Sequence, residues 1–137
     1  MPEINWLATG VATLVMFALG GIWFGPKTFF PIWWKAMGRS ESEQPGGQNM
    51  GQVFGLTAVG QFVQALILGV ICSQFAATNW LSGATVGFMV GLGFNGLGTI
   101  SHRLFAGHGL KVWIIEVASD ILNLTVAGAI FGAFAAF

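Results

Sequence analysis

The chain has 137 residues, of which 55% are hydrophobic and 7% are charged, and its formal net charge is zero. Soluble domains carry roughly 25% charged residues, so this composition excludes an ordinary soluble domain and predicts an integral membrane protein. Zero net charge argues against a nucleic-acid surface and against a polybasic lipid-binding patch. Cys72 is the single cysteine, which excludes an intrachain disulfide and a cysteine-cluster metal site.

Four apolar runs follow one another along the chain, at about residues 4–25, 51–78, 81–103 and 110–135. Each has about the length that an α-helix needs to cross a bilayer. We therefore expect one all-α domain over residues 1–137, an up-down bundle of four transmembrane helices. A signal peptide has Lys or Arg before its apolar segment, and the first run has neither. We therefore expect the first run to stay uncleaved.

The longest connection, residues 26–50, divides into two parts. Its first half, KTFFPIWWKAMG, holds bulky aromatic residues between Lys27 and Lys35. This mixture suits a short segment lying in the lipid headgroup region, and it equally suits a set of rings that caps the bundle. The second half, GRSESEQPGGQN, is polar and glycine-rich, so we expect a mobile loop tip there.

Glycines at four-residue spacing predict the faces on which the helices pack. Gly83, Gly87 and Gly91 recur in the third run, while Gly128 and Gly132 lie in the fourth. Rows of small residues let two helix backbones approach closely in lipid. We therefore expect these five glycines at helix–helix contacts, with the row of the third run as the central packing face.

The cations predict the orientation of the bundle. They lie in the first and third connections, which share a side of a four-helix bundle: Lys27, Lys35, Arg39, Arg103 and Lys111. Cytoplasmic loops of membrane proteins carry an excess of Lys and Arg. We therefore expect loop 26–50 in the cytoplasm and both termini on the non-cytoplasmic side.

The fourth run carries two acids inside an apolar segment. Glu116 and Asp120 stand four residues apart, so they share a helix face, with Asn123 one turn further along. An ionised acid is costly in lipid unless it is paired, so we expect Asp120 to face the bundle interior beside Asn95 or Gln61. Glu116 lies nearer the cationic connections. The candidate polar or ion site comprises Glu116, Asp120, Asn123, Asn95, Gln61 and His102.

Each run contributes one hydrogen-bonding side chain at a similar depth. At about 1.5 Å per residue, Thr13, Gln61, Asn95 and Asp120 fall roughly 12–17 Å into their runs. The two histidines do not follow a metal-binding spacing with the acids. Since no phosphate loop or nucleophile motif is present either, we expect no metal, no cofactor and no catalytic residue.

Parts of the chain resemble the bacterial domain of unknown function 1761 family. The resemblance rests on NWLATGVATLVMFALGGIWFGP and WWKAMG near the start, and on LFAGHGLKVWIIEVASDILNLTVAGAIFGAF near the end. It implies a small four-helix protein of the bacterial inner membrane, without an activity that can be carried over. Acids at the positions of Glu116 and Asp120 are not part of the family pattern.

Two classes of function follow from these features, and an enzyme is the least favoured third. Small size favours an accessory or structural subunit that packs on other membrane subunits or on itself within the lipid bilayer. The alternative is a small proton- or cation-coupled transporter that uses Glu116 and Asp120. A further alternative to both is that the two acids have a purely structural role, in which they hydrogen-bond to Gln61, Asn95 or His102 and set the helix register.

Overall fold

The computed structural model describes residues 3–40 and 49–135, and these residues form helices and no strand. The helices are α1 (Trp6–Trp23), α2 (Phe30–Ala36), α3 (Met50–Gln74), α4 (Trp80–Val90), η1 (Gly91–Gly96), α5 (Leu97–Phe105) and α6 (Gly109–Ala135). Because α4, η1 and α5 run on continuously, four helical stretches are long and apolar enough to cross a membrane: α1, α3, α4–α5 and α6. The expected all-α fold with four transmembrane helices is confirmed.

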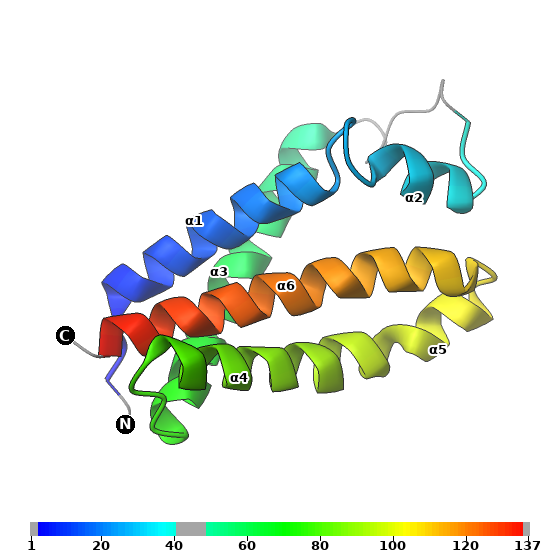
Figure 1. Cartoon of the computed structure of the whole chain (residues 1–137). Coiled ribbons are helices and arrows are strands. Elements are labelled where there is room, and N and C mark those ends of the chain that lie inside the picture. The colour runs from blue at the N-terminus through cyan, green and yellow to red at the C-terminus, as the bar shows by residue number, and fades with distance from the viewer. Residues whose placement is uncertain (1–2, 41–48, 136–137) are drawn as a thin grey trace.

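These four stretches alternate in direction (Figure 1). The beginning of α1 and the end of α6 lie at one end of the bundle, whereas α2 and the α5–α6 connection lie at the other. The second end carries Lys27, Lys35, Arg39, Arg103 and Lys111, and we call it the cationic end. Helix α6 is central, because it packs against each of the other helices and buries residues along its whole length.

Glycines set the close contact between α4 and α6. A Cβ atom added to Gly83 would lie 2.0 Å from the Gly128 carbonyl oxygen, and one added to Gly87 would lie 1.9 Å from that of Leu124. From the other side, a Cβ on Gly132 would lie 2.0 Å from the Asn79 oxygen. The structure therefore places both expected glycine rows in one backbone-to-backbone interface. Gly91 continues this interface, where an added Cβ would lie 3.0 Å from the Cα of Ile121.

Asparagine side chains start three of the helices. Asn5 accepts a hydrogen bond from the backbone N–H of Ala8 at 2.9 Å, and Asn49 caps α3 in the same way. Asn79 forms a reciprocal capping box with Ser82 at the start of α4. Each cap satisfies a backbone donor that the first helical turn leaves unpaired, which is costly in lipid.

Helix α3, which corresponds to the expected span 51–78, ends at Gln74 because a Schellman motif terminates it. The backbone N–H of Ala77 donates to the Cys72 carbonyl at 2.9 Å, and Ala76 adopts a positive φ of 51°. Ala77 and Cys72 are both buried, which supplies the apolar contact that accompanies this motif. The expected span 4–25 similarly ends at Trp23, before Pro26, while the expected span 81–103 extends to Phe105.

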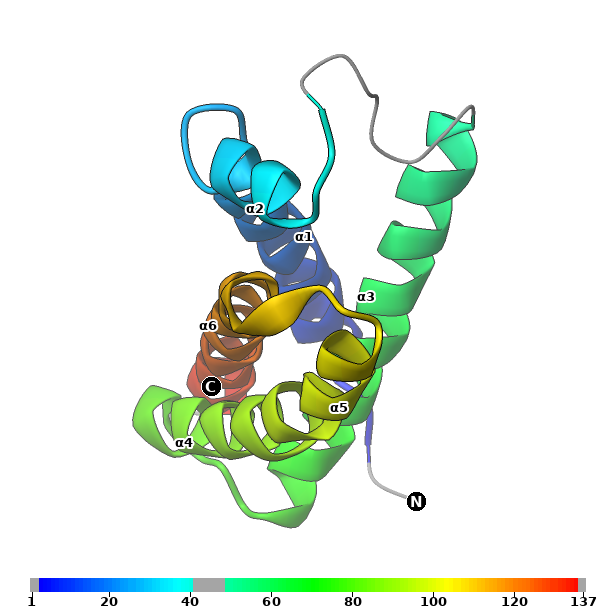
Figure 2. The same cartoon turned by 90° about the vertical axis from the view of Figure 1, so that its right-hand side faces the viewer.

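The beginning of α3 stands away from the rest of the bundle (Figure 2). Only Ala65, Leu68 and Cys72 are buried in this helix, and all three lie in its second half. Large apolar side chains of the first half are exposed, among them Phe54 and Leu56. The loop tip expected between α2 and α3 falls on residues 41–48, which lie outside the described residues.

Candidate polar cleft between α1, α3 and α6

A cleft of about 510 Å³ separates the first half of α3 from α1 and α6, with α2 at its cationic end. This volume falls in the range of small-molecule sites, roughly 300–1,000 Å³. Aromatic and aliphatic side chains form most of the wall, and hydrogen-bonding side chains from α3 and α6 form the remainder. The lining residues are Phe17, Gly20, Gly21, Phe24, Phe30, Trp33, Met50, Val53, Phe54, Thr57, Gln61, Glu116, Ser119, Asp120 and Asn123.

The polar strip of the cleft comes from one face of α6. Glu116, Ser119, Asp120 and Asn123 are spaced by three and four residues, so their side chains point the same way. All four line the cleft, and Ser119 and Asn123 are buried. Two acids and an amide that the sequence places on one face therefore share one cavity, and Ser119 joins them without having been predicted.

Gly20 has no side chain, which leaves space on α1 for the side-chain amides of Gln61 and Asn123. A Cβ atom on Gly20 would lie 3.8 Å from Gln61 Nε2 and 4.0 Å from Asn123 Nδ2, so both amide nitrogens approach the bare face of α1. Gln61 and Asp120 each lie about 15–17 Å from the cationic end of their helices at 1.5 Å per residue, which is the middle of a bilayer. The amide side chains of α3 and α6 thus approach the same part of α1.

Four buried polar atoms have no hydrogen-bond partner among the described residues, and all four belong to side chains that line this cleft. They are Gln61 Oε1, Asn123 Oδ1, Glu116 Oε1 and Trp33 Nε1. Buried polar atoms are nearly always paired, because an unpaired one forfeits its interaction with water. Three of these four atoms, on Gln61, Asn123 and Glu116, are hydrogen-bond acceptors.

Asp120 reaches a second polar side chain on the far side of α6. The side chain of Asn95 lies within hydrogen-bonding reach of the Asp120 carboxyl. Asn95 belongs to η1, a π-helical segment in which the N–H of Leu97 donates to the Leu92 carbonyl five residues back. Such a wide turn displaces backbone groups from their usual partners. Trp113 Nε1 compensates by donating to the Gly96 carbonyl at 3.0 Å.

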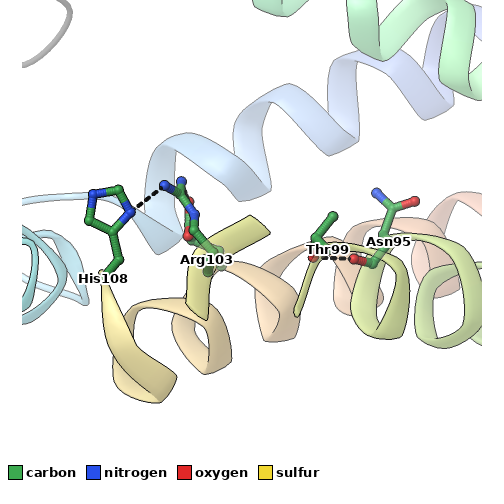
Figure 3. Close-up of polar contacts among 5 residues, drawn as sticks. Asn95, Thr99, Arg103 and His108 are labelled. Carbon is green, nitrogen blue, oxygen red and sulfur yellow. Dashed lines mark hydrogen bonds and ion pairs between the residues drawn. The ribbon is translucent and has the colours of Figure 1, made fainter. Parts of the chain in front are cut away.

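Glu116 is held by Arg103 and not by His102. Arg103 forms an ion pair with Glu116, and its Nη1 lies 3.0 Å from His108 Nδ1 (Figure 3). Arg103 also stands in line with Asn95 and Thr99 along η1 and α5, as Figure 3 shows. His102 is exposed and does not line the cleft, so the structure does not bring this predicted residue into the site.

Thr13, which was expected at the same depth, is also not part of the cleft. Its hydroxyl donates to the Thr9 carbonyl of its own helix at 2.7 Å. Among the described residues, no group of three or more His, Cys, Asp and Glu side chains is arranged to hold a metal ion.

The aromatic residues after α1 close the cleft at its cationic end. Trp33 packs edge-on against Phe24 with ring centroids 5.2 Å apart, and Phe30 lies 5.8 Å from the same indole. All three side chains line the cleft. The sequence predicted that these rings form a cap or an interfacial segment, but it did not predict that Trp33 lines the cleft.

These features define a four-helix integral membrane protein with a polar cleft at mid-depth. The chain belongs to the DUF1761 family of proteins of unknown function, whose family model matches residues 7–132. The resemblance noted in the sequence is thereby confirmed. No curated protein and no solved structure matches the chain.

Proposed function

We propose that this protein is a small carrier that binds a cationic solute in the cleft, with Asp120 as the binding carboxylate. The observation that supports this function most is that four buried polar atoms without a partner among the described residues all belong to side chains that line one cavity. A purely structural network would pair those atoms with one another, since half-satisfied networks are destabilising. Binding and exchange need no chemical step, so the proposal includes no enzymatic activity.

The two acids take different parts in this proposal. Glu116 shares its charge with Arg103, and their side chains are 22% and 30% exposed, so this carboxylate is already balanced. The polar partner of Asp120 is the side-chain amide of Asn95, which carries no charge. A carboxyl group at mid-depth is tolerated in lipid when it is protonated or paired with a cation. Proton and solute therefore compete for one group, which is the basis of an exchange carrier.

An accessory subunit is the second candidate, and the exposed first half of α3 favours it. Phe54, Leu56 and Val59 are 55%, 65% and 61% exposed there, so a helix of another subunit or of a second copy can pack against this half of α3. Under this alternative the cleft is covered by protein, and Asp120 hydrogen-bonds to the covering helix.

Flux through proteoliposomes distinguishes the two functions. The carrier predicts that an organic ammonium gradient drives proton movement through the purified protein, and that Asp120→Asn abolishes it. Glu3→Gln is the matched control, because it removes a carboxylate that does not line the cleft. Flux that survives in Asp120→Asn, or the absence of flux with every ammonium compound in a panel of different sizes, contradicts the carrier.

We also propose that the cationic end faces the cytoplasm of a bacterial inner membrane. The support is that all five Lys and Arg residues lie in loop 26–50 or in the adjoining ends of α5 and α6, at Arg103 and Lys111. The excess of positive charge in cytoplasmic loops then places both termini on the other side.

A further inference from the structure

Three of the side chains that line the cleft carry acceptor groups. Asp120 contributes a carboxylate, and Gln61 Oε1 and Asn123 Oδ1 are buried oxygens without a partner among the described residues. Asp120 and Asn123 are three residues apart on α6. A Cβ atom on Gly20 would lie 3.8 Å from the Gln61 amide nitrogen and 4.0 Å from the Asn123 amide nitrogen, so both amide groups approach the same part of α1. A ligand group that fits this point is positively charged and donates several hydrogen bonds.

The remainder of the wall determines what is attached to that group. Phe17 and Phe54 face each other across the α1–α3 side, with ring centroids 6.3 Å apart, and both line the cleft. Phe24 adds a third ring. Aromatic faces attract cations and pack against apolar bodies, so they fit a ligand that combines a charge with a ring or a short hydrocarbon.

The rim of the cleft indicates the route by which such a ligand arrives. Val53 and Phe54 line the cleft and are 37% and 55% exposed. This rim lies within a membrane-spanning helix, so the opening meets lipid. An amphiphilic solute dissolved in the bilayer can reach this rim from the lipid.

We propose that the cleft selects a protonated primary amine with an aromatic or short apolar body, and that it discriminates against quaternary ammonium ions. The proposal rests on the carrier function above and specifies its substrate class. A primary ammonium carries three N–H donors, one for each acceptor group of Asp120, Gln61 and Asn123. A quaternary ammonium has the same charge but no donor, so it leaves the two amide oxygens unpaired. Sites built for hydrogen bonds discriminate strongly against analogues that lack them.

The test compares 2-phenylethylammonium with its N,N,N-trimethyl analogue by calorimetry on protein in lipid nanodiscs. We expect the primary amine to bind at least about tenfold more tightly, as the loss of charged hydrogen bonds implies. Gln61→Met should reduce this preference by removing one acceptor. Thr85→Val is the matched control, because the Thr85 hydroxyl donates to the Leu81 carbonyl at 2.8 Å and Thr85 does not line the cleft.

Each outcome of this comparison is decisive. Equal or tighter binding of the quaternary ion to the wild-type protein, lost in Asp120→Asn, overturns the donor selectivity and leaves the cation carrier standing. Binding of neither compound, in protein whose thermal unfolding shows that it is folded, removes the proposed function together with the substrate class. A primary-amine preference that Gln61→Met leaves unchanged overturns the assignment of the acceptors.

Discussion

Gly87→Ala should separate α4 from α6. The added Cβ atom would lie 1.9 Å from the Leu124 carbonyl oxygen and 3.1 Å from the Cα of Thr125, and both are backbone atoms that cannot turn aside. Restoring an ordinary contact near 3.4 Å requires the two helices to move apart by about 1.5 Å. Added methyl groups in well-packed interiors cost about 1–3 kcal/mol. Since the obstacle here is backbone, we expect about 3 kcal/mol.

Thermal and denaturant unfolding of the purified protein in mild detergent measures this loss. Gly60→Ala is the control, because Gly60 lies within α3 and an added Cβ would meet nothing within 4 Å. Alanine is the better helix former by up to about 1 kcal/mol, so the control should be neutral or stabilising. Equal stability of Gly87→Ala and Gly60→Ala would refute the close α4–α6 packing.

Further predictions concern sidedness and two polar contacts. In intact cells, Thr78→Cys should react with a membrane-impermeant thiol reagent and Ala106→Cys should not; the reverse result contradicts the proposed orientation. Arg103→Gln should lower the free energy of unfolding by roughly 1 kcal/mol, because the ion pair with Glu116 is partly exposed, and Glu116→Gln should recover the loss; no recovery would mean that the pair is not the cause. Trp113→Phe should cost about 1 kcal/mol by removing the 3.0 Å bond to the Gly96 carbonyl, which then keeps the Thr99 hydroxyl at 3.2 Å. An unchanged unfolding midpoint would show that the Thr99 hydroxyl is sufficient for this carbonyl.

The helices and their packing faces were predictable because lipid restricts the possible structures. Apolar length alone locates the four spans, and glycines at four-residue spacing mark the α4–α6 contact. The end of α3 was not predictable, because Ala76 occupies the left-handed position where glycine is usual. By contrast, α5 ends at Phe105 and is followed by Gly107 with a φ of 78°, and a glycine just after a helix is the usual sequence signal for its end.

The site was only partly predictable, because it depends on where helices diverge. The spacing of Glu116 and Asp120 gives their common face, and the depth estimate selects Gln61 and Asn95 as possible neighbours. The π-helical turn that carries Asn95 has no sequence signature, since it arises from packing against α6. Likewise, neither the separation of α3 nor the approach of Trp33 from α2 follows from periodicity.

Photoaffinity labelling tests the presence of a ligand in the cleft most directly. An arylalkylamine with a diazirine on its ring, crosslinked to the protein in lipid nanodiscs and mapped by mass spectrometry, should label Phe17, Phe54 and Trp33. Excess 2-phenylethylammonium should compete this labelling away, and Asp120→Asn should abolish it. Labelling confined to exposed residues outside the cleft, such as Phe94 and Phe105, and insensitive to competitor would contradict a binding site between α1, α3 and α6.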